Sequence, residues 1–172
     1  METMFLGIIV FLFLLAIFDL VVGVSNDAVN FLNSAVGSKA ASFKTIMIIA
    51  AIGIFFGATL SNGMMEIARH GIFRPEQFYF QELMCIFLAV MVTDVVLLDI
   101  FNTLGMPTST TVSMVFELLG GTFVLALIKI AVDETGLLGF DDLLNTEKAL
   151  SVILGIFLSV AIAFFFGTLV QY

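Results

Sequence analysis

The chain has 172 residues, of which 61% are apolar and only 12% are charged, and its mean hydropathy is +1.20. Soluble domains contain about 45–50% apolar and about 25% charged residues, so this composition indicates a protein whose solvent is lipid. A net charge of −8 with six Lys and Arg residues offers no basic surface for nucleic acid. One cysteine and one histidine exclude an intramolecular disulfide and a Cys/His zinc site. We therefore expect an all-α integral membrane protein, with residues 1–172 as a single membrane domain.

Five stretches reach the roughly 20 apolar residues that a helix needs to cross a bilayer. They are residues 4–24, 46–65, 83–104, 112–132 and 149–170. The first stretch lacks a basic start and a small-residue cleavage site, so we expect a retained span rather than a signal peptide.

The links between these stretches are short. Residues 66–82 contain several aromatic residues, which fits either a segment at the membrane interface or an ordinary loop with packed aromatics. Residues 133–148 are acidic but lack the ligand spacing of an EF-hand, so we interpret them as a solvated loop.

The fourth stretch departs from a simple span, because Pro107 precedes it and Gly120-Gly121 interrupts it. Divided at the glycine pair, it becomes two limbs of about 17 Å each, which is about half a bilayer. A re-entrant hairpin over residues 108–132 fits this pattern, and one continuous helix with a closely packed glycine pair fits it equally.

The choice between the two structures also decides the predicted orientation. Five full spans place Lys129 and Lys148 on the side of the N-terminus, whereas a hairpin moves both to the other side. The positive-inside rule then places the N-terminus outside if the hairpin is present.

A polar stripe begins within the first span. Small and polar residues recur at alternating spacings of four and three, and they are Asp19, Gly23, Asn26, Asn30, Asn33 and Gly37. Such a stripe lies on one helix face and either borders a cavity or forms a hydrogen-bonded seam between helices. Asp27, flanked by Asn26 and Asn30, favours the cavity because it supplies hard oxygen ligands for a small cation.

Four hydroxyl residues, at positions 108–111, follow Pro107 and begin a helical segment. The first N–H groups of a helix have no intrahelical partner, and the helix dipole favours an anion at that end. A plain N-cap is the alternative. Together with the carboxylate site, this helix start predicts a cation-coupled anion transporter.

Two segments resemble the inorganic phosphate transporter (PiT) family. Residues 25–30 (Ser-Asn-Asp-Ala-Val-Asn) are similar to its G-A-N-D-x-x-N signature, and residues 105–111 (Gly-Met-Pro-Thr-Ser-Thr-Thr) are similar to its G-x-P-x-S-T-T segment. The resemblance implies sodium- or proton-coupled uptake of inorganic phosphate across the cytoplasmic membrane. It also implies two inverted repeats, each with a signature helix and a re-entrant hairpin. This favours the hairpin at 108–132, and hence about four transmembrane helices plus the hairpin.

The resemblance assigns roles by position. It implies that Asp27 and Asn30 bind the coupling cation, with Asp27 as a sodium ligand if the ion is sodium, and that no other cofactor is present. The phosphate ligands that it implies are Asn26, Asn30, Ser109, Thr110 and Thr111.

Some features depart from the family pattern. Val24 replaces the leading Gly of the signature, and Val112 replaces a His. Because related carriers move sulfate, a related oxyanion such as sulfate is the alternative substrate. Three further acidic residues match no motif and belong either to an ion path or to a structural helix face: Asp94, Asp99 and Glu117.

The sequence contains only one copy of each motif, so we expect one repeat of two. The missing half is then a second copy in a homodimer or a second repeat. The alternative is a non-transporting membrane subunit with an assembly or regulatory role. An enzyme is not expected, because His70 and Cys85 have no partners at catalytic spacing.

Overall fold

The computed structural model describes residues 2–60, 71–134 and 136–171. The expectations for His70 and the rest of residues 66–70, and for the last five residues of the second apolar stretch, fall outside these ranges. The described residues form helices and loops, with one isolated β-bridge between Phe73 and Leu144. The helices are α1 (Glu2–Gly37), α2 (Phe43–Leu60), the short 3-10 helix η2 (Pro75–Gln77), α4 (Phe80–Leu104), α5 (Thr110–Val132), α6 (Phe140–Leu143) and α7 (Thr146–Gln171).

The all-α membrane fold predicted from composition is confirmed. Helices α1, α2, α4, α5 and α7 are all long and apolar enough to cross a membrane. Helix α1 has 36 residues and is therefore about 54 Å long at about 1.5 Å per residue. It continues well beyond its apolar stretch, so the polar stripe belongs to the same helix as the first span.

The predicted re-entrant hairpin at 108–132 is wrong for the structure, in which α5 is one unbroken helix of 23 residues. Neither Gly120 nor Gly121 has a positive φ, so the glycine pair makes no turn. A Cβ on Gly121 would lie 3.7 Å from Ile86 Cγ2 and 3.9 Å from Val90 Cγ2. Both distances are ordinary van der Waals contacts, so α5 packs against α4 at this glycine. A continuous helix also satisfies its own backbone, which a hairpin tip in lipid cannot do.

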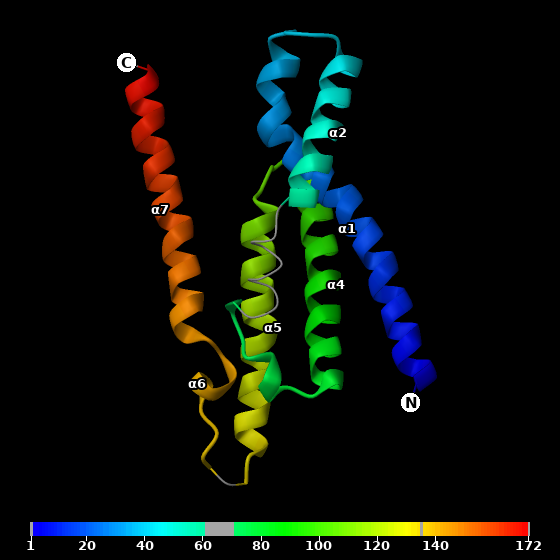
Figure 1. Cartoon of the computed structure of the whole chain (residues 1–172), viewed down its shortest axis with the longest axis vertical. Coiled ribbons are helices and arrows are strands. Elements are labelled where there is room, and N and C mark those ends of the chain that lie inside the picture. Colours follow the sequence, from blue (N-terminus) through cyan, green and yellow to red (C-terminus); the bar gives the residue numbers. More distant parts are fainter. Residues whose placement is uncertain (1, 61–70, 135, 172) are drawn as a thin grey trace.

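The continuous helix changes the topology. The chain begins and ends at opposite ends of the structure (Figure 1). The C-terminal end of α5 and the start of α7, with Lys129 and Lys148, therefore lie toward the N-terminal end of α1. The prediction that the N-terminus lies outside depended on the hairpin, so the structure no longer supports it.

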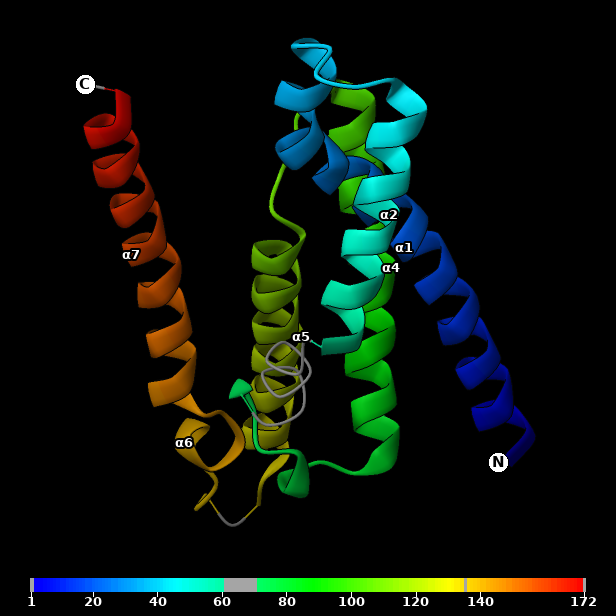
Figure 2. The same ribbon diagram turned by 45° about the horizontal axis from the view of Figure 1, so that its top comes forward.

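The bundle is built around α4. Helices α1 and α5 both pack against α4, while α2 packs against α1. Both views place α7 to one side, beyond α5 and away from α1 (Figures 1 and 2). This arrangement brings the upper part of α1 next to the connection between α4 and α5, which positions the two sequence motifs.

The end of the bundle nearest the N-terminus is closed by packed loops. Phe73 and Phe78 are buried and meet edge to face at 5.7 Å between ring centroids. Tyr79 and Phe80 remain exposed. In residues 71–82, therefore, two aromatic residues belong to the core and two are exposed, as a segment at the membrane interface would require.

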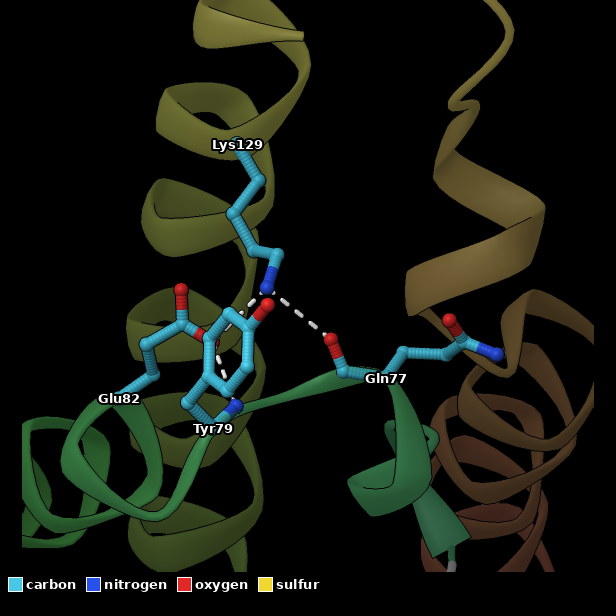
Figure 3. Close-up of polar contacts among 4 residues, drawn as sticks. All are labelled: Gln77, Tyr79, Glu82 and Lys129. Carbon is cyan, nitrogen blue, oxygen red and sulfur yellow. Dashed lines mark hydrogen bonds and ion pairs between the residues drawn. The ribbon is translucent and has the colours of Figure 1, made fainter.

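Lys129 joins this end of α5 to the start of α4 (Figure 3). Its Nζ donates to the Glu82 carboxylate at 2.8 Å and to the Gln77 carbonyl at 3.0 Å. It also lies 5.2 Å from the ring centroids of both Phe78 and Tyr79. Lys129 is thus a structural cation at the end of the bundle.

Candidate functional site

The amide of Asn26 joins α1 to the loop that connects α4 with α5. Asn26 is only 1% exposed. Its Oδ1 accepts from the backbone N–H of Thr108 at 2.8 Å, and its Nδ2 donates to Asn102 Oδ1 at 2.8 Å. Asn102 in turn donates to the Val22 carbonyl at 3.0 Å. These bonds hold the two sequence motifs together across more than 75 residues of sequence.

Asp27 makes the second contact between the motifs. The Thr110 hydroxyl donates to Asp27 Oδ2 at 2.8 Å, from the first residue of α5. Asp27 is half-buried. Gly23, one turn earlier on α1, faces this contact, and a Cβ there would lie at ordinary van der Waals distance, 3.6 Å from the Thr110 methyl group and 3.7 Å from Leu98.

Asn30 extends the contact by one more helical turn. Its Nδ2 donates to the Thr108 carbonyl at 3.2 Å, which leaves Oδ1 for another partner. Asn30 also lines a pocket of about 470 Å³ with Asn33, Ser34 and Pro107. The polar stripe therefore borders a pocket at Asn30 and Asn33 and forms a hydrogen-bonded seam between helices at Asn26, so each of the two predicted alternatives holds for part of it.

The start of α5 carries the hydroxyl cluster. Ser109 is the N-cap, and its hydroxyl accepts from the Val112 N–H at 3.4 Å. Ser109 and Thr111 are exposed, whereas Thr110 is half-buried against Asp27. The cluster thus combines an N-cap with the positive end of a helix dipole, where an anion is favoured.

Asn102 was missed by the sequence analysis. It lies eight residues after Asp94 on α4, and Leu98 lies midway, so all three share one face. That spacing was the available signal. Two polar residues eight positions apart in an apolar helix lie on one face and mark it as turned toward other polar groups.

The three acidic residues outside the motifs are placed differently from one another. Asp94 is 2% exposed and faces α1 and α5, Glu117 is half-buried on α5, and Asp99 is exposed. A second cavity, of about 170 Å³, is lined by Asp94 together with Asp19, Asp27 and Thr110. Within the described ranges, no three His, Cys, Asp or Glu residues are arranged to hold a metal ion.

Several apolar helices that enclose polar groups and a helix N-terminus define a membrane transport protein. The phosphate transporter family model matches residues 23–172, and the chain belongs to this family. The family resemblance read from the two motifs is thereby confirmed. No curated protein and no solved structure shows a significant match to the chain.

Membership of this family implies phosphate transport as the function of the chain. The matched region contains both motifs and all of α2, α4, α5 and α7 up to Gln171. It begins at Gly23, so Asp19 precedes it.

Proposed function

We propose that this chain takes part in cation-coupled transport of inorganic phosphate across the cytoplasmic membrane, with sodium or a proton as the coupling ion. One observation carries the proposal. Asn26 and Asp27 of the first motif bind the backbone of Thr108 and the hydroxyl of Thr110 in the second. In this proposal, therefore, the residues expected to bind the cation and the helix start expected to bind the anion form one site rather than two.

In this proposal phosphate binds at the start of α5, beside the pocket lined by Asn30. The exposed hydroxyls of Ser109 and Thr111 donate hydrogen bonds to it, as does Thr110 once it turns from Asp27. Asn26 is a predicted ligand too. Its Oδ1 and Nδ2 are both hydrogen-bonded within the chain. Its main role in this proposal is therefore to position the Thr108 backbone.

The cation binds at Asp27 and Asn30. Neither cavity that borders these two residues has Lys, Arg or His among its lining residues in the described parts of the chain. A phosphate anion next to an ionised Asp27 would be repelled strongly at this depth. A cation at Asp27 removes that repulsion, and the mutual dependence of the two ligands constitutes coupling.

A second half completes the site in this proposal, either another copy of the chain or a second repeat. Asn30, Ser109 and Thr111 are all exposed on the single chain, whereas a transporter must seal its substrate from both sides at once. The missing surface lies opposite the pocket at Asn30.

Uptake of radiolabelled phosphate into liposomes containing the purified chain tests the proposal, with an imposed sodium gradient and, separately, a pH gradient. Asp27→Asn keeps the shape and removes the charge, so gradient-driven uptake should be lost. Asp99→Asn is the matched control because Asp99 is exposed on α4, and its uptake should be unchanged. Gradient-driven uptake that persists in Asp27→Asn would exclude Asp27 as the cation ligand.

The phosphate ligands are tested by binding rather than by uptake. Ser109→Ala and Thr110→Ala should weaken phosphate binding more than cation binding, with Ser159→Ala on α7 as the control. An equal loss of phosphate binding and cation binding would indicate a folding defect. Phosphate binding without any uptake would favour the non-transporting subunit.

A further inference from the structure

A second polar cluster lies deeper in the bundle than the phosphate site and is used by none of the steps above. Asp19 of α1, Asp94 of α4 and Glu117 of α5 come from three different helices that pack against one another. Asp19 precedes Asp27 by eight residues, or about 12 Å of helix. The cluster is therefore roughly two turns from the cation ligand, in the central part of the spans.

Each carboxyl group of the cluster has one oxygen without a hydrogen-bond donor. Asp94 Oδ1, Asp19 Oδ1 and Glu117 Oε2 are all buried and have no hydrogen-bond partner. Asp19 and Asp94 line the same cavity, and Glu117 lies on α5, which packs against both α4 and α1. Ser113 donates to the other oxygen of Glu117 at 2.9 Å. Two carboxyl groups can hydrogen-bond to each other only when one of them carries a proton.

No basic side chain compensates the three acidic groups within the described parts of the surrounding helices. Helix α2 carries only Lys44, in its first turn, and the one cation of α5 is Lys129. Lys129 lies 12 residues from Glu117 and is paired with Glu82. The other titratable group that lines the cavity beside the cluster is also acidic, namely Asp27 on α1. Three ionised carboxylates here would be uncompensated charges in lipid.

A cavity leads from the cluster toward the proposed site. Its volume is about 170 Å³, and its lining includes Asp19 and Asp94 of the cluster as well as Asp27 and Thr110. A water molecule occupies about 30 Å³ in the liquid, so the cavity has room for a short chain of water molecules. Asp94 is 2% exposed, and its side chain, whose Oδ1 has no hydrogen-bond partner, lines this cavity.

We propose that Asp19, Asp94 and Glu117 form a proton-binding site, in which one proton is held on Asp94 and shared with the Asp19 carboxyl. A proton fits better than a metal ion because it satisfies a carboxyl pair without further ligands, and no metal-holding group of three occurs in the described residues. The proton reaches and leaves this pair through the cavity beside Asp27. As a coupling site it rests on the proposed phosphate transport, whereas proton binding itself does not.

Infrared spectroscopy of the full chain in lipid tests proton binding without any need for transport. The carbonyl stretch of a protonated carboxylic acid should be present at neutral pH and should disappear at alkaline pH. Asp94→Asn, which imitates the protonated form and should fold normally, removes this band, while Asp99→Asn retains it. Asp19→Asn and Glu117→Gln shift the pH at which the band disappears.

Three results would overturn the assignment. They are the absence of the band at neutral pH, its persistence in Asp94→Asn, and its loss when sodium chloride replaces choline chloride. The last result would assign the cluster to a metal cation instead.

A transport measurement distinguishes failure of this inference from failure of the proposed function. In liposomes, Asp94→Asn should abolish stimulation of phosphate uptake by a pH gradient while phosphate exchange without a gradient continues. Failure of exchange in the unaltered chain would refute the proposed function and leave the infrared result intact. Stimulation by the pH gradient that survives in Asp94→Asn would refute the coupling role alone.

Discussion

Replacement of Asn26 by leucine is the sharpest test of how the two motifs are held together. Leucine has nearly the shape of asparagine, so Asn26→Leu removes hydrogen bonds without leaving a cavity. The change leaves the Thr108 N–H without its acceptor and Asn102 Oδ1 without its donor. Because Asn26 is 1% exposed, water cannot easily replace either bond.

The size of the effect follows from these two bonds. Interhelical hydrogen bonds in membrane proteins contribute about 0.6 kcal/mol each on average, which gives about 1.2 kcal/mol for the pair. A buried group left unsatisfied costs about 1–3 kcal/mol, which raises the total if Thr108 or Asn102 finds no new partner. We expect the free energy of unfolding to fall by about 2 kcal/mol, between these two limits.

The measurement is equilibrium unfolding in mixed detergent micelles, combined with protease cleavage in the segment 105–109. Asn33→Leu is the matched control, because Asn33 is exposed on the same helix two turns later. Cleavage should rise in Asn26→Leu alone, since the Thr108 backbone is released. If Asn26→Leu and Asn33→Leu unfolded alike and were cleaved alike, Asn26 would not be the link between the motifs.

Two further predictions concern other parts of the bundle. Lys129→Met should lower the free energy of unfolding by about 1 kcal/mol, because it removes a half-buried ion pair and contacts with two aromatic rings; a loss no larger than that of the exposed Lys148→Met would contradict this. In a Cys85→Ser chain, thiols introduced by Ser109→Cys and by Glu134→Cys should be labelled by impermeant reagents from opposite sides of the membrane, since α5 is continuous. Labelling of both thiols from the same side would contradict the continuous helix and support a hairpin at residues 108–132.

The number and kind of elements could be predicted from the sequence. In lipid, backbone groups must be satisfied within the chain, so a run of about 20 apolar residues has few alternatives to a helix. The kind of ligand that each motif favours could also be predicted. A carboxylate such as Asp27 favours a cation, and the hydroxyls that follow Pro107 can donate to an anion, whatever the tertiary structure. The family followed from the same residues.

The path of α5 could not be decided in this way. A glycine pair permits a turn and permits close helix packing, and the sequence around Gly120 and Gly121 is compatible with both. The neighbouring helix decided between them, because Ile86 and Val90 fill the space beside Gly121. Family resemblance pointed to the hairpin, and packing against α4 gave the continuous helix.

The sequence by itself determined that this is a helical membrane protein with the two motifs of the phosphate transporter family. Only the tertiary structure decided which residues of the two motifs meet, and it showed that Asn102 bonds to one of them. The bond between Asn26 and Asn102 joins residues 76 positions apart, and no local pattern encodes such a partner. Likewise Asp19, Asp94 and Glu117 are three separate acidic residues in the sequence, and they become one cluster only because α1, α4 and α5 pack together.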